Sequence, residues 1–141
     1  MNSFFDTSVL VPVFVPGHQH HERSLSVFSR ADRNSAYCGT HSLAEVYASL
    51  TRLPGKYRAA PEQALMCLDT IGERLNLIAL EVAEYISAIR EAAGLGIEGG
   101  ALYGALLGAC AIKARADILY TWSTRDFQRL GPNITGRLRT P

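Results

Sequence analysis

The sequence lacks several features that would assign it to an exported, membrane-bound or zinc-binding class of protein. Its three cysteines, Cys38, Cys67 and Cys110, are widely spaced and form no C-x-x-C pair, which argues against a zinc or redox site. No apolar run approaches the length of a membrane span, and the N-terminus shows no signal-peptide pattern. We therefore expect a cytoplasmic protein with reduced thiols and no membrane partner.

A strong net charge and the common nucleotide-binding loops are also missing. The formal net charge is only +1, so any binding of nucleic acid must come from a local basic patch rather than from the field of the whole protein. The chain has neither a P-loop pattern G-x-x-x-x-G-K-[ST] nor a G-x-G-x-x-G after its first apolar run. These absences argue against a small nucleotide-binding α/β protein.

What the sequence does contain is a regular alternation of short apolar runs and longer segments with helical periodicity. The apolar runs predict strands over residues 3–6, 36–39, 75–80 and 118–120. Helices are predicted over residues 9–15, 20–29, 42–53, from 61 onward, 81–93 and 101–114, with a glycine-rich loop over 94–100. Such alternation predicts a single α/β domain over residues 1–141, whose mostly parallel sheet is covered by helices on both faces.

Two acidic residues stand where such a sheet binds its ligands. In open parallel sheets, ligands bind outside the carboxyl ends of the strands. Asp6 ends the first predicted strand, and Asp126 follows the last one after a few residues. These carboxylates are the first candidates for a functional site.

Three segments together resemble the PIN-domain ribonucleases of the VapC toxin type. They are FFDTSVL at residues 4–10, SLAEVY at 42–47 and LYTWSTRDF at 119–127, and their order and spacing are also similar to the family. The resemblance covers nearly the whole chain and implies a three-layer α/β/α domain with endoribonuclease activity. It further implies Mg²⁺ or Mn²⁺ bound by clustered acids, RNA as substrate, a homodimer, and a VapB-type antitoxin that blocks the site.

The resemblance assigns the first two metal-binding and catalytic acids to Asp6 and Glu45. Clustered carboxylates hold hard divalent ions, which activate water and neutralise charge on the phosphate. Local sequence alone offers another role for each, because Asp6 can cap the next helix and Glu45 can close a capping box begun by Ser42. The family pattern favours the metal role for both, and it places Thr7 in contact with substrate.

The third acid of the family is missing. The family usually has Asp after an aromatic residue in a pattern like L-Y-x-A-L, and here that catalytic position is Gly104. A glycine inside a helix costs roughly 1 kcal/mol relative to alanine, so local folding does not explain it. Three explanations for the missing acid remain: a naturally degenerate site, an inactivating substitution in a toxic gene, or compensation by Glu98. We favour the substitution. We expect Glu98 to be a solvated loop residue.

A second departure lies in the last segment, where Ser123 stands at a position that commonly carries Asp or Asn. Ser123 either contacts the metal or substrate through its hydroxyl or caps a helix. Asp126 either supplies a further catalytic carboxylate to the metal or pairs with Arg125, which we otherwise expect to contact substrate. With two firm carboxylates we expect weak metal binding. The alternative function is a catalytically inactive PIN domain that binds its antitoxin or RNA.

Three histidines and the single tryptophan each have more than one interpretation. His18, His20 and His21 can bind a transition metal, contact phosphate or lie at a solvated helix start, which we favour because the spacing matches no recognised zinc pattern. Trp122 can stack on a base, but a single tryptophan beside a strand is more often packed at the edge of a domain.

Overall fold

The short apolar runs form one parallel sheet at the centre of the molecule. The structure is a computed structural model that describes all of residues 1–141, and its five strands lie in the order β3-β2-β1-β4-β5. All four pairings between neighbouring strands are parallel. The strands are β1 (Ser3–Phe5), β2 (Ala36–Gly39), β3 (Asn76–Ile78), β4 (Ile118–Tyr120) and β5 (Leu138–Arg139).

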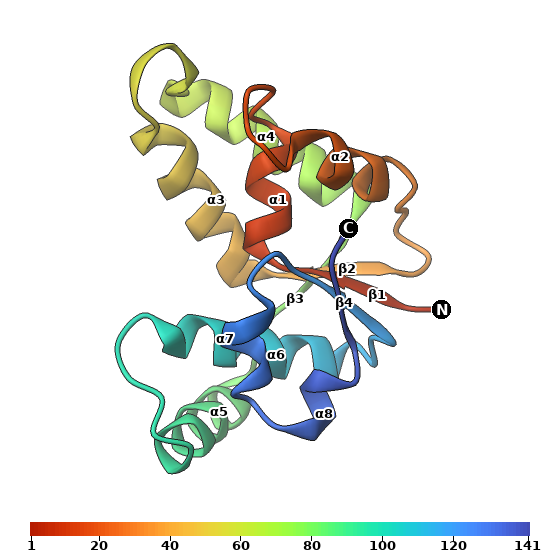
Figure 1. Ribbon diagram of the computed structural model, residues 1–141, viewed down its shortest axis with the longest axis vertical. Coiled ribbons are helices and arrows are strands. Elements are labelled where there is room, and N and C mark those ends of the chain that lie inside the picture. The colour runs from red at the N-terminus through yellow and green to blue at the C-terminus, as the bar shows by residue number, and fades with distance from the viewer.

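Helices cover both faces of this sheet, as the alternating pattern predicts (Figure 1). One layer holds α1 (Thr7–Val13), α2 (His21–Ser29), α3 (Thr40–Arg52) and α4 (Pro61–Arg74), with a short 3₁₀ turn at Gly55–Tyr57. The other layer holds α5 (Val82–Gly94), α6 (Ala101–Lys113), α7 (Thr124–Gln128) and α8 (Pro132–Thr135). The three-layer α/β/α architecture is therefore confirmed. No helix combines the length and the apolar character that a membrane crossing requires.

Two hydrophobic clusters hold the layers together, and β1 contributes a phenylalanine to each of them. Successive side chains of a strand point to opposite faces of its sheet. Phe5 packs among residues of α1 to α4, whereas Phe4 packs with residues of α6 and β4, and each is at most 1% exposed. The strand that ends at Asp6 is thus buried on both faces, which fixes the position of this acid.

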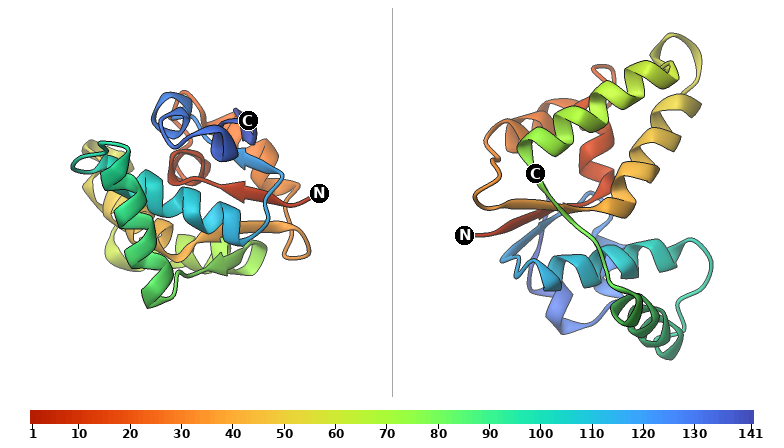
Figure 2. Two further views of the ribbon diagram at one scale, coloured as in Figure 1. Left: turned by 90° about the horizontal axis from the view of Figure 1, so that it is seen from below. Right: turned by 180° about the vertical axis from the view of Figure 1, so that it is seen from behind.

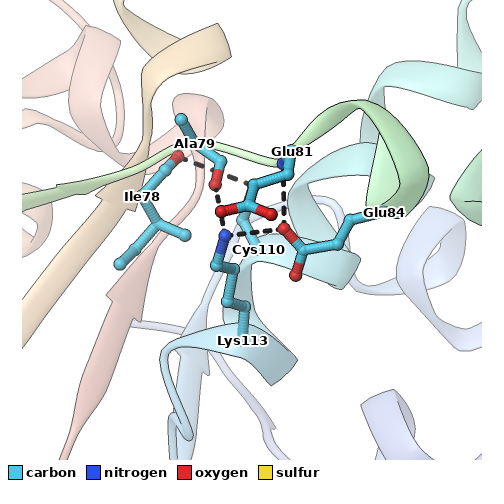
Figure 3. Close-up of polar contacts among 6 residues, drawn as sticks. All are labelled: Ile78, Ala79, Glu81, Glu84, Cys110 and Lys113. Carbon is cyan, nitrogen blue, oxygen red and sulfur yellow. Dashed lines mark hydrogen bonds and ion pairs between the residues drawn. The ribbon is translucent and has the colours of Figure 1, made fainter. Parts of the chain in front are cut away.

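Side-chain contacts also join helices within each layer. α3 and α4 pack against one another and extend away from the sheet, as the right-hand view of Figure 2 shows. On the opposite face, Lys113 Nζ lies 2.6 Å from Glu84 Oε1 and donates to the carbonyl oxygen of Ala79 at 2.9 Å (Figure 3). These contacts tie α6 to the start of α5 and to the end of β3.

Some predicted boundaries are wrong. The α3 helix begins at Thr40 with Gly39 as its N-cap, so Ser42 lies inside the helix and the capping box proposed for Ser42 and Glu45 does not form. The helix predicted over residues 9–15 begins at Thr7 and ends at Val13. The short elements α8 and β5 were not predicted, because two to four residues are too few to show a periodic pattern, and α7 was anticipated only as the helix that Ser123 would cap.

Candidate active site

The site is built around Asp6, which directly follows β1 at the N-cap position of α1 and is 5% exposed. Its carboxylate makes no capping hydrogen bond, contrary to the simpler of its two interpretations. Instead, Asp6 Oδ2 accepts hydrogen bonds from Ser8 Oγ at 2.7 Å and from Thr121 Oγ1 at 2.8 Å. Two hydroxyl groups from different segments therefore hold this carboxylate at the end of β1.

The second carboxylate, Glu45, projects from α3 and is held by the first turn of α1. Thr7 Oγ1 donates to Glu45 Oε1 at 3.0 Å and lies 2.9 Å from Oγ of the buried Ser42. His41, one helical turn earlier on α3, has its Nε2 atom 3.8 Å from the same Glu45 oxygen. That buried nitrogen has no hydrogen-bond partner. Thr7, which we expected beside the substrate, thus also positions Glu45.

Both acids face one cavity of about 250 Å³, which has twelve lining residues. The predicted residues among them are Asp6, Thr7, Glu45, Gly104, Ser123 and Asp126. Arg125 is exposed and does not line the cavity. A larger cavity of about 430 Å³ between α5, α6 and α8 has a mostly apolar lining and contains none of the predicted residues. The chemically relevant groups therefore meet in the smaller cavity.

The wall of the cavity is open at the position of the missing acid. Gly104 lies in α6, and a Cβ atom built on it meets no atom within 4 Å. A side chain at this position therefore has room beside the cavity that Asp6 and Glu45 line. Glu98 is exposed and does not line the cavity, so it does not replace the missing carboxylate.

The last segment contributes one exposed acid. Asp126 lies in the first turn of α7, lines the cavity and makes no ion pair with Arg125. Ser123 occupies the N-cap position of α7, but its hydroxyl makes no capping bond. Its backbone N–H donates to Thr121 Oγ1 at 2.9 Å. The simpler interpretations of Asp126 and Ser123 thus find no support in the hydrogen bonds and ion pairs.

Burial disfavours the ionised form of both inner acids. Burial raises the pKa of Asp6, and its effect is larger than that of the hydrogen bonds from Ser8 and Thr121, which lower the pKa. Burial also raises the pKa of Glu45, where Thr7 and His41 lower it and the charge of Asp6 raises it further. A hard cation would favour the ionised form of both groups. The structure brings together no group of three or more His, Cys, Asp or Glu side chains that could hold a metal ion.

Sequence reasoning missed three residues of this site: Ser8, Thr121 and His41. Ser8 and Thr121 belong to the first and last of the family-like segments, but only the pairing of β1 with β4 shows that both hydroxyls reach Asp6. His41 precedes Glu45 by four residues in α3, a spacing that places two side chains on the same face of a helix. This spacing was the one available signal for His41.

Solved structures of other proteins share this fold. The crystal structure of Mycobacterium tuberculosis VapC20, described as a sarcin–ricin loop cleaving toxin, superposes with a TM-score of 0.73 and 13% identity. That match covers 89% of this chain and 92% of the other. VapBC2 from Rickettsia felis, bound to a promoter DNA fragment, gives a TM-score of 0.67 and 21% identity over 100% of this chain and 99% of the other. At these identities the likeness concerns the fold.

Sequence comparison gives the family. The PIN-domain profile matches residues 3–131. Ribonuclease VapC27 of Mycobacterium tuberculosis is 37% identical in an alignment 135 residues long, and the match covers 92% of this chain and 92% of the relative. Ribonuclease VapC40 of the same species is 35% identical over 123 residues, or 87% of this chain and 85% of the relative. With a profile match over most of its length and two such relatives, the chain belongs to the PIN-domain family and, within it, to the VapC group of ribonucleases.

Proposed function

We propose that this chain is the toxin of a type II toxin–antitoxin pair, a cytoplasmic Mg²⁺- or Mn²⁺-dependent endoribonuclease whose site is impaired at Gly104. The observation that carries the proposal is the meeting of Asp6 and Glu45 at one cavity, beside an open helical position that bears no side chain. The names of the relatives, two ribonucleases, support the reaction class.

Asp6 and Glu45 would hold the divalent cation, and Asp126 would add an outer oxygen ligand. When bound, the cation activates water and neutralises charge on the scissile phosphate. Ser8, Thr121 and Thr7 orient the two inner carboxylates through their hydroxyls. Because partners of metal ligands normally tune affinity, these three hydroxyl groups contribute to metal binding without contacting the metal.

The substrate and partner assignments extend the same proposal. Ser123 lines the cavity and Arg125 lies on the exposed side of α7, where a guanidinium group can pair with a phosphate of RNA. A VapB-type antitoxin would cover the site, and the toxin would form a homodimer. Solved VapBC complexes with the same fold support an antitoxin as partner.

A second function is favoured by one specific observation. Gly104 supplies no carboxylate to the cavity, and no three metal-ligating side chains come together there in a group that could hold an ion. A chain in this form can act as a catalytically inactive PIN domain that binds its antitoxin or RNA without cutting. The two functions differ in whether a single added carboxylate creates activity.

The test is cleavage of a mixed RNA pool with Mg²⁺ or Mn²⁺ by four proteins: the chain itself, Gly104→Asp, Gly104→Ala and the double variant Gly104→Asp with Asp6→Ala. We expect Gly104→Asp to cut and the double variant to be silent. Gly104→Ala is the matched control, because it restores helix propensity without a carboxylate. EDTA should abolish all cutting.

Each other outcome has a definite meaning. If no variant cuts with either ion, the nuclease proposal is wrong and the binding function replaces it. If Gly104→Ala cuts as well as Gly104→Asp, the missing carboxylate is not the cause of impairment. Cutting that persists in EDTA would show a reaction that does not depend on this metal site.

A further inference from the structure

A stack of flat side chains lies next to the active site and has no role in the chemistry described so far. The imidazole of His20 lies parallel to the indole of Trp122, with ring centroids 3.8 Å apart and an angle of 8° between planes. The ring of His18 follows at 5.6 Å from His20, tilted by 38°. The guanidinium carbon of Arg23 lies 5.9 Å from the centre of the Trp122 ring. We call these four side chains the ring ladder.

Hydrogen bonds fix the inner end of the ring ladder relative to Asp6. The backbone N–H of Trp122 donates to Ser8 Oγ at 2.9 Å, and this hydroxyl donates in turn to Asp6 Oδ2 at 2.7 Å. The indole N–H of Trp122 donates to Oγ of the buried Ser24 at 2.9 Å. Only two hydrogen bonds therefore separate the indole-bearing residue from the innermost acid of the site.

Both ends of the ring ladder, His18 and Arg23, carry unused hydrogen-bond donors. His18 Nδ1 accepts the backbone N–H of His20 at 3.0 Å, so the neutral ring carries its proton on Nε2, which is free to donate. Arg23 is exposed and pairs with no carboxylate. The three histidines do not form a group suited to a metal ion. The geometry gives no support to the transition-metal interpretation of this cluster, and an anionic ligand suits its donors.

We propose that the ring ladder binds a nucleotide of single-stranded RNA next to the scissile phosphate. The base extends the stack at the half-exposed outer ring of His18, whose N–H binds the adjoining backbone phosphate, while Arg23, at the Trp122 end, binds a neighbouring phosphate on the side of the active site. Stacking on flat side chains accepts every base, and guanidinium groups bind phosphate strongly. This inference rests on the proposed RNA substrate. The ring ladder is then a surface that binds RNA and takes no part in the catalytic step.

The test uses the chain with Gly104 in place, because impaired cutting lets RNA binding reach equilibrium. The probe is a short fluorescent single-stranded RNA of mixed sequence, and its anisotropy is measured in EDTA. We expect His18→Ala and His20→Ala to weaken binding by roughly 5- to 150-fold, which is the contribution of one stacked base. His20→Phe keeps a flat ring and should retain most of the affinity. Arg23→Ala should weaken binding and reduce its salt dependence by about one phosphate contact.

Arg90→Ala is the matched control, since Arg90 is an exposed arginine on α5, across the sheet from the ring ladder. It should bind RNA as the parent does. Unchanged RNA affinity in His18→Ala and His20→Ala, or no RNA binding by the parent, would overturn the proposal. The same holds if Arg90→Ala loses as much affinity as Arg23→Ala, or if the ladder variants lose binding of a VapB-type antitoxin and not of RNA.

A second measurement separates this inference from the proposed nuclease function. In the Gly104→Asp protein, His20→Ala should raise KM for RNA and leave kcat largely unchanged. If Gly104→Asp cuts RNA with the same KM with and without His20→Ala, the nuclease stands and the ring ladder proposal is wrong. If the ladder variants lose RNA binding but Gly104→Asp never cuts, the binding surface stands and the nuclease proposal is wrong.

Discussion

The stability of variants at Gly104 tests the metal site without any measurement of cleavage. Gly104 is a helical residue of α6, and a Cβ atom added there meets no atom within 4 Å. Replacing such a glycine with alanine stabilises a protein by roughly 0.5–1 kcal/mol. In a chain of this size this corresponds to a rise in Tm of roughly 2–4 °C. Gly104→Ala should therefore be more stable than the parent, with or without metal.

Gly104→Asp should behave differently because it adds a third carboxylate beside two acids whose pKa values burial already raises. Without metal, repulsion among these charges should make this variant less stable than Gly104→Ala. A cation that binds only the folded state adds about 2.7 kcal/mol when its free concentration is 100 times Kd. Saturating Mn²⁺ should thus raise the Tm of Gly104→Asp by several degrees more than that of Gly104→Ala.

The assay is thermal unfolding followed by circular dichroism, in EDTA and in a series of Mn²⁺ concentrations. Gly104→Asp with Asp6→Asn serves as a control that removes one inner ligand and should lose most of the Mn²⁺ effect. Equal Mn²⁺ shifts in Gly104→Ala and Gly104→Asp would refute the reasoning, since position 104 would then not share a cation with Asp6. A lower Tm for Gly104→Ala would refute the inference that glycine is not required by the helix.

Three further predictions concern other groups of the structure. Burial raises the pKa of Asp6 in the folded chain above its ordinary value of 3.8, so above pH 3.8 the folded chain binds more protons than the unfolded chain. In the absence of metal, the contribution of Asp6 to the free energy of unfolding should therefore fall as the pH rises from 3.8 through the folded-state pKa. Urea unfolding between about pH 4 and 7 should show a smaller fall for Asp6→Asn, and an identical pH profile would contradict the shift. Ser8→Ala removes a hydrogen-bond donor to Asp6 and the acceptor of the Trp122 backbone N–H. The free energy of unfolding, measured with urea, should therefore fall by about 1–3 kcal/mol, and a fall of under about 0.5 kcal/mol would contradict these hydrogen bonds. Burial raises the pKa of Cys38 to about 12 and that of Cys110 to about 11, so both thiols should be unreactive in the folded chain. Mass spectrometry should show that iodoacetamide at pH 8 labels neither cysteine until urea is added. Labelling of either cysteine in the folded chain would contradict its burial.

Local patterns predicted most of the secondary structure and the first acid of the site. The apolar runs predicted the positions of β1 to β4 in the sequence, because a buried strand needs only a few consecutive apolar residues. Asp6 was identified from its position at the end of the first run, and the structure confirms that Asp6 directly follows β1. The capping box of Ser42 and Glu45 was the misleading case, since the same residues that form such a motif also occur inside a helix.

The sequence by itself determined the α/β alternation, the burial of β1 between two helical layers, the absence of a carboxylate at Gly104, and the family to which these belong. Only the tertiary structure decided that Glu45, Gly104 and Asp126 line one cavity, and that His20 lies flat on Trp122. The physical reason is that periodicity reports which face of an element is buried, whereas distances between separate segments depend on strand order and on how crossover helices pack.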